Sequence, residues 1–231
     1  MFKQWSMFFD ENKVLDNLTI PNTLTEKFNL SPLLPPIGDQ GRQGSCASWT
    51  TTYYLKSFQE RTTSNLPYDS NRIMTPAYTY NQISQGICEG TEFENTLNIL
   101  KAEGAVSLES FPYFDYSCNI QPNPLQTVNA AANKISDCEY LNDENIVLEM
   151  KTLITDQTPI LISVFLTSQF GIVDKFGLTS HREHFVNYNL PGGCHAMLVV
   201  GYSDSFNAFK VVNSWREDWD DNGITLHLIT Y

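Results

Sequence analysis

A glutamine and a cysteine in one short loop are the residues of this chain best suited to chemistry. Gln40 and Cys46 are separated by six positions and precede an apolar segment with helical spacing. A cysteine is a useful nucleophile only as a thiolate, and the unpaired N–H groups in the first turn of a helix stabilise that anion. The loop therefore predicts a reactive thiol with an oxyanion donor beside it. Gln43 is a rival donor in the same loop, and the spacing favours Gln40.

A cysteine nucleophile also needs a base to take its proton and a group to orient that base. His195 follows a Gly-Gly-Cys segment and opens an apolar run that predicts a buried strand, which would fix the imidazole ring. Asn213 ends the next predicted strand, so its amide oxygen can accept from one ring nitrogen while Trp215 shields that bond from water. We expect His181 and His184 to be solvated loop residues, because no further metal ligand stands at a suitable spacing.

The elements that must position these residues change in type along the chain. Helical spacing of apolar residues predicts helices over 45–61, with Ser45 as N-cap, from 75 onward, over 92–102 and over 143–155. Apolar and alternating runs predict strands over 160–165, 196–202, 208–213 and 224–230. A helical half followed by a sheet-rich half therefore indicates an α+β fold, with the first 36 residues as a strap across the surface.

Composition excludes several classes of partner. The chain has 231 residues, of which 42% are hydrophobic, enough to bury a substantial core. The 26 Asp and Glu residues outnumber 14 Lys and Arg, so we expect neither nucleic acid nor an anionic membrane surface as a partner. No apolar run reaches the length of about 18 residues that a transmembrane helix needs. The five cysteines form no Cys-x-x-Cys pair, and we predict no metal and no cofactor.

Several segments together resemble the papain-like cysteine peptidases. They are Gln40, Gly44-Ser45-Cys46, His195-Ala196, Gly201-Tyr202 and Asn213-Ser214-Trp215. The resemblance spans about 34–228 and implies a two-lobed α+β fold, with a helical left lobe, an antiparallel β-barrel-like right lobe and the active-site cleft between them. One papain-like peptidase domain over 1–231 would then combine a helical lobe, 34–122, with a sheet-rich lobe formed by 1–33 and 123–231.

The resemblance also implies an activity and a set of site residues. The implied activity is hydrolysis of peptide bonds through a thioester acyl-enzyme, and we expect an endopeptidase. The implied catalytic residues are Cys46 as nucleophile, His195 as acid and base, Asn213 as orienting group and Gln40 as oxyanion donor. The implied substrate-binding residues are Gly90 and Thr91, which match a glycine-containing segment that pairs with the substrate backbone, together with Gly44 and Trp215. The expected partners of this monomer are a protein or peptide substrate and an inhibitory pro-segment or protein inhibitor.

One departure from the family pattern concerns the cysteines. Many relatives carry a cysteine three positions before the nucleophile, and this chain has Gln43 there. Cys88 therefore lacks its usual disulfide partner, and we expect Cys118 to replace it. Disulfides favour a secreted or otherwise oxidising compartment.

Two alternative functions stay open. An acyltransferase, for example a transglutaminase-like enzyme, would use the same cysteine and histidine. A degenerate peptide-binding module would keep the fold without turnover, although the intact set of Cys46, His195, Asn213 and Gln40 argues against it. The side-chain preference for substrate does not follow from one sequence, because residues scattered through both lobes form that pocket.

Overall fold

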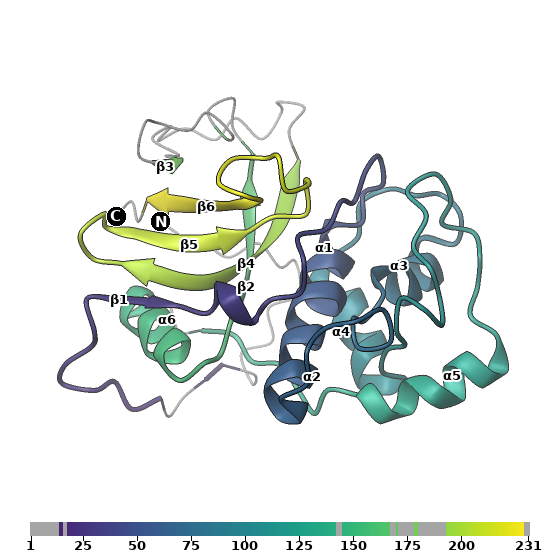
Figure 1. Ribbon diagram of the computed structural model, residues 1–231, viewed down its shortest axis with the longest axis horizontal. Helices are drawn as coiled ribbons and strands as arrows, with labels where there is room; N and C mark the ends of the chain where they lie inside the picture. The colour runs from purple at the N-terminus through teal and green to yellow at the C-terminus, as the bar shows by residue number, and fades with distance from the viewer. Residues whose placement is uncertain are drawn as a thin grey trace.

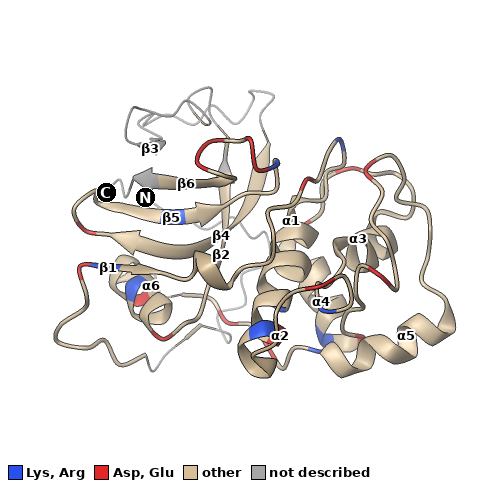
Figure 2. Cartoon of the chain, in the orientation of Figure 1, with Lys and Arg blue, Asp and Glu red and all other residues tan. Residues whose placement is uncertain are grey.

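Two parts of different architecture lie side by side in the molecule (Figure 1). The computed structural model describes residues 14–15, 18–141, 145–166, 170, 178–179 and 193–228. One part contains α1 to α5, and the other contains a six-stranded sheet with α6 beside it. Asp and Glu residues lie on loops of both parts (Figure 2), as expected of solvated surface charge.

A continuous helical segment begins at Cys46 and forms the centre of the helical part. It consists of α1 (Cys46–Ser48), a π-helix (Trp49–Lys56) and α2 (Ser57–Ser64). The sequence predicted one helix over 45–61. The structure differs in the π-helical stretch and in the end at Ser64. The Thr50 and Thr51 hydroxyls donate to carbonyls four residues earlier, at 2.9 and 2.8 Å. Such side-chain bonds supply a donor to these carbonyl groups where the π-helix replaces the usual hydrogen bonds between residues four apart.

The helices that follow begin where capping residues stand. In α3 (Pro76–Ser84) the Thr75 hydroxyl accepts from the Ala77 N–H, and proline occupies the first turn, as predicted. The next helix, α4 (Phe93–Ala102), ends before Gly104, whose φ of +95° suits glycine. By contrast, Ser45 precedes α1 without capping it, so its predicted N-cap bond is absent.

Helix α5 (Pro124–Ala130) was not predicted. A capping box starts it: Asn123 and Gln126 each bond the other's backbone N–H, at 3.0 and 2.9 Å. Its last residue, Ala130, is buried against Tyr78 and Phe111 of the helical part. The helical part therefore includes α5, whereas the expected helical lobe ended at residue 122 and the sheet-rich lobe resumed at residue 123.

The sheet has the order β1-β4-β5-β6-β3, with β2 also paired to β4. Its strands are β1 (Lys27–Asn29), β2 (Ile160–Phe165), β3 (Leu178–Thr179), β4 (Cys194–Ser203), β5 (Ala208–Val212) and β6 (Ile224–Leu228). Neighbours pair antiparallel, except β3 with β6. The four long strands were predicted, whereas β1 and β3 are too short to show a pattern. Helix α6 (Ile146–Thr155) lies within the helix predicted over 143–155. It contacts β4.

Strand β4 carries the contact between the two parts. From Ala196 to Tyr202 its side chains are buried, and Met197 to Val200 belong to one core cluster with Trp49 and Tyr54 of the helical segment. Helix α1 also contacts β4. The start of the helical segment therefore meets the start of β4, and this contact brings Cys46 toward His195.

Candidate active site

Cys46 lies at the junction of the two parts, as the first residue of α1 and partly buried. The backbone N–H of Ala196, the residue after His195, is one of the groups that favour the anionic form of the Cys46 sulfur. Burial raises the pKa of the thiol above the ordinary 9.0, while hydrogen bonds from the Ala196 and Ala47 N–H groups act in the opposite direction. The contact between α1 and β4 places Cys46 beside the strand that begins with Cys194 and His195.

His195 and Asn213 form a buried pair. The Nε2 atom of His195 lies 2.7 Å from Oδ1 of Asn213, and both residues are less than 5% exposed. The same Oδ1 accepts from the backbone N–H of Ser214, at 2.7 Å. A backbone N–H can only donate, so the shared amide atom is the oxygen and Nε2 must donate to it. Nδ1 is therefore the basic nitrogen of the neutral ring.

Aromatic rings cover this pair. Trp215 stacks on the His195 ring with centroids 4.5 Å apart, and Phe170 lies edge-on to Trp215 at 5.5 Å. Phe170 also stacks on Trp219, at 5.8 Å. The resulting burial lowers the pKa of His195 below the ordinary 6.5, an effect that the hydrogen bond to Asn213 partly opposes. Trp215 was expected to shield this bond, whereas Phe170 stands in no recognisable motif and was not expected near it.

The Tyr54 hydroxyl ties the helical part to Asn213 and to the loop before Cys46. The Tyr54 hydroxyl donates to the Asn213 carbonyl, at 2.8 Å, and accepts from the Gly38 N–H, at 3.0 Å. Tyr54 therefore connects the loop before Cys46 with the strand end that orients His195.

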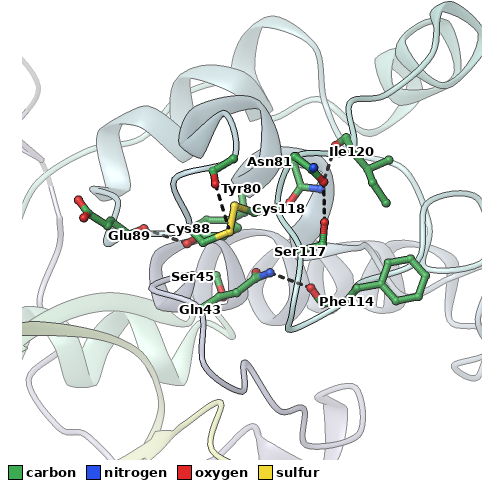
Figure 3. Close-up of a disulfide and its surroundings, with 12 residues drawn as sticks. Gln43, Ser45, Tyr80, Asn81, Cys88, Glu89, Phe114, Ser117, Cys118 and Ile120 are labelled. Atoms are coloured by element: carbon green, nitrogen blue, oxygen red, sulfur yellow. Dashed lines mark hydrogen bonds between the residues drawn. A yellow bond between two sulfur atoms is a disulfide. The ribbon is translucent and has the colours of Figure 1, made fainter.

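Gln40 is held from both sides. Its Nε2 donates to the Gln43 carbonyl at 2.9 Å, and its Oε1 accepts from the Ser214 hydroxyl at 2.7 Å. An amide nitrogen carries two protons, so one remains to donate elsewhere. The rival Gln43 points the other way, and its Nε2 donates to the Phe114 carbonyl at 2.7 Å (Figure 3). The two glutamines therefore differ in surroundings, and only Gln40 is fixed to the residue next to Asn213.

Gly44 and Gly90 meet where this loop approaches the segment after Cys88. The Gly44 N–H donates to the Cys88 carbonyl, and a Cβ at Gly44 would lie 2.5 Å from backbone atoms of Glu89 and Gly90. Gly90 is exposed, and a Cβ there would meet nothing within 4 Å. The Thr91 hydroxyl is buried with no partner among the residues that the structure describes. Gly44 therefore permits a close backbone approach, whereas Gly90 borders open space.

Replacing Gly44 with alanine should destabilise this approach. Because the new Cβ would collide with backbone rather than with a movable side chain, we expect a loss of roughly 1–3 kcal/mol in the free energy of unfolding and a marked loss of any activity. Urea denaturation of Gly44→Ala, of Gly90→Ala and of the native chain measures the free energy of unfolding. Gly90→Ala is the matched control, since its Cβ has room, and it should unfold within about 0.5 kcal/mol of the native chain. Equal stabilities of the two variants would contradict the prediction.

The segment around Gly90 is anchored by a disulfide. Cys88 and Cys118 are bonded, with Cα atoms 5.7 Å apart and 30 positions between them in sequence, which confirms the predicted pairing (Figure 3). Tyr80 of α3 donates to the Glu89 carbonyl at 2.9 Å. The disulfide therefore joins the segment that includes Gly90 to the loop that also accepts the Gln43 bond.

Two sequence predictions concern metals and membranes. Among the residues with described placement, no three His, Cys, Asp or Glu side chains gather as a metal site. None of the helices over the same ranges is long and apolar enough to cross a bilayer. His181 and His184 lie outside the described residues.

Known proteins resemble this chain along most of its length. The model for papain family cysteine proteases matches residues 25–228. Mouse pro-cathepsin H is 26% identical over 197 residues, which cover 84% of this chain and 56% of that protein. Oryzain gamma chain from Oryza sativa is 23% identical over 222 residues, which cover 92% of this chain and 56% of the relative. The chain thus spans a little more than half the length of these relatives.

Solved structures agree on the fold. Xylellain, a cysteine protease from Xylella fastidiosa, superposes with a TM-score of 0.76 at 19% identity, covering 96% of this chain and 87% of that one. Digestive procathepsin L 3 from Tenebrio molitor larval midgut gives a TM-score of 0.69 at 16% identity, covering 96% and 70%. These structures confirm the predicted papain-like α+β fold. With the family model matched from the first strand to the last, the chain belongs to the papain family of cysteine proteases.

Proposed function

We propose that this chain is a cysteine peptidase that hydrolyses peptide bonds with Cys46, His195 and Asn213 as its triad. The observation that carries the proposal is the buried His195–Asn213 hydrogen bond of fixed direction, formed at the start of the strand β4 that α1 contacts, with Cys46 as the first residue of α1. This direction leaves a basic ring nitrogen, Nδ1, available to a neighbouring thiol.

Proton transfer from the Cys46 thiol to His195 Nδ1 starts the proposed reaction. Burial opposes the charged form of each group separately, since it raises the pKa of the thiol and lowers that of the imidazole. Transfer of one proton creates both charges together, and at short distance in a poorly polar site the two charges stabilise each other. The imidazolium keeps its Nε2–H bond to Asn213 throughout.

The thiolate then attacks the carbonyl carbon of the scissile bond. A C–S bond forms, and the electron pair of the carbonyl moves to oxygen, where the free Nε2–H of Gln40 and the backbone N–H of Cys46 donate to it. His195 returns its proton to the leaving amine as the C–N bond breaks, and a thioester remains. Water, deprotonated by His195, attacks the thioester and releases the acid and the Cys46 thiol.

The substrate binds, in this proposal, across the junction of the helical part and the sheet. Gly90 is exposed beside open space, which suits pairing with an extended peptide backbone, and Thr91 and Gly44 adjoin it. Trp215 borders the site from the sheet side. We propose endopeptidase action by a monomer, with residues 1–231 forming one domain.

Regulation and location belong to the same proposal. The relatives named above include pro-forms, pro-cathepsin H and procathepsin L 3, which supports control of this chain by an inhibitory pro-segment or a protein inhibitor. The Cys88–Cys118 disulfide suits a secreted or otherwise oxidising compartment.

A peptide-library digest tests the function. Native chain and Cys46→Ala are incubated with the library in the presence and absence of an added primary amine, and products are read by mass spectrometry. We expect new peptide termini from the native chain only, formed by water. Termini that carry the amine would show acyl transfer instead. Peptides that bind both proteins and stay intact, with Cys46 labelled by iodoacetamide no faster than in denatured chain, would overturn the proposal in favour of a binding module.

A further inference from the structure

We infer that Tyr113 is a positioning residue whose hydroxyl fixes Gln40 relative to Cys46, the two residues that supply donors to the oxyanion. The inference rests on the proposed function, because it concerns how that site stabilises charge. Tyr113 lies far from both residues in sequence and touches neither His195 nor Asn213 in any hydrogen bond of the described residues.

Two hydrogen bonds of the Tyr113 hydroxyl join the two ends of the loop before Cys46. The hydroxyl donates to the backbone carbonyl of Gln40 at 2.7 Å and lies 2.9 Å from the Ser45 hydroxyl. A phenol has one proton, and a carbonyl can only accept, so the Tyr113 proton goes to Gln40. The Ser45 hydroxyl must then donate to Tyr113. The result is a directed chain from Ser45 through Tyr113 to Gln40.

In Ser45, the hydrogen bond to Tyr113 takes the place of the usual helix-capping bond. A serine directly before a helix commonly caps the helix with its side chain, and Ser45 makes no such bond. Its hydroxyl is fully buried and serves Tyr113 instead. The residue next to the nucleophile is thus held by a side chain 68 positions away.

The Tyr113 hydroxyl also supplies one of the hydrogen bonds that hold Gln40 in place. Ser214 holds the Gln40 backbone N–H and side-chain oxygen, and Tyr113 holds its carbonyl. Hydrogen bonds to the backbone N–H and to the backbone carbonyl of Gln40 together set the orientation of the residue. Because an oxyanion donor must lie within about 0.5 Å of its productive position, removing one of these points should misplace the donor.

Tyr113 is itself anchored well enough to act in this way. Its ring lies edge-on to Trp49, with centroids 5.0 Å apart. The neighbouring Phe114 carbonyl accepts from Gln43, and Cys118 of the same loop is joined to Cys88 (Figure 3). Burial raises the pKa of Tyr113, so the hydroxyl keeps the proton that it donates at physiological pH.

The test compares two reactions of Cys46 in Tyr113→Phe. Hydrolysis of a peptide amide builds an oxyanion, whereas alkylation by iodoacetamide is a displacement at carbon and builds none. We expect kcat for the peptide to fall about 10- to 100-fold, with KM and the alkylation rate within about twofold of native values. Tyr68→Phe is the matched control, since it also removes a tyrosine hydroxyl that lies near backbone carbonyls, 2.8 Å from that of Leu33 and 3.2 Å from that of Ser57, away from the loop.

Three outcomes would count against the inference. Unchanged kcat in Tyr113→Phe shows that the hydroxyl positions nothing, and an equal fall of alkylation shows damage to the thiol rather than to the oxyanion donors. A similar loss in Tyr68→Phe shows a general effect of destabilisation. Should Tyr113→Phe fail to fold, Ser45→Ala removes the other bond of the hydroxyl and must lower kcat in the same selective manner. A native chain that cleaves nothing would instead overturn the proposed function.

Discussion

Replacing His195 with alanine should move the reaction of Cys46 with iodoacetamide from near-neutral pH to above pH 9. Without the imidazole the thiolate has no counter-charge, and burial keeps the pKa of the thiol above 9.0. A group whose pKa exceeds 9 is ionised in fewer than about one molecule in a thousand at pH 6. We therefore expect labelling at pH 6 to fall by at least about 10³-fold, and peptide hydrolysis to fall about 10²- to 10⁴-fold.

The measurement is the rate of labelling between pH 5 and pH 10, followed at the Cys46 peptide by mass spectrometry. Following that peptide matters because Cys194 is also a free and exposed thiol, which the reagent can reach. Cys46→Ala supplies the background. If His195→Ala kept native labelling at pH 6, the helix start and the Ala196 N–H would suffice to ionise Cys46, and His195 would not be its partner.

Replacing Gln40 with alanine should lower kcat for a peptide amide about 10²- to 10³-fold while KM stays within a few-fold. The reason is that the amide donor acts on charge that develops only in the transition state. Steady-state kinetics measure the effect, and the alkylation rate of Cys46 should not change.

Gln43→Ala is the control that separates the two glutamines of the loop. Gln43 donates to the Phe114 carbonyl, so its loss should cost about 1 kcal/mol of stability and less than about tenfold in kcat. A larger fall of kcat in Gln43→Ala than in Gln40→Ala would reverse their assignment.

The strands that position His195 and Asn213 were predictable because long buried strands have a recognisable apolar sequence pattern. Strand β4 is buried along nearly its whole length, and β5 follows it after a short turn. Two adjacent antiparallel strands of this kind must place the start of one near the end of the other. Proximity of His195 to Asn213 therefore followed from topology.

The parts that sequence did not reveal depend on contacts between distant segments. The two- and three-residue strands β3 and β1 carry no periodicity, and β1 forms because Gly201 leaves room for the Phe28 carbonyl. The π-helical stretch looks like any helix in sequence, since its register is set by packing. The start of helix α5 is encoded locally, because Asn123, Pro124 and Gln126 form a capping pattern.

The disulfide between Cys88 and Cys118 has a practical consequence for handling the protein. The proposed chemistry requires one sulfur in the thiol form, while the segment bearing Gly90 is tethered by two sulfurs in the oxidised form. A preparation must satisfy both demands at once. Mild monothiols should keep Cys46 reduced and spare the bridge, whereas strong dithiols after partial unfolding should cut the tether and lower activity while the nucleophile itself stays intact.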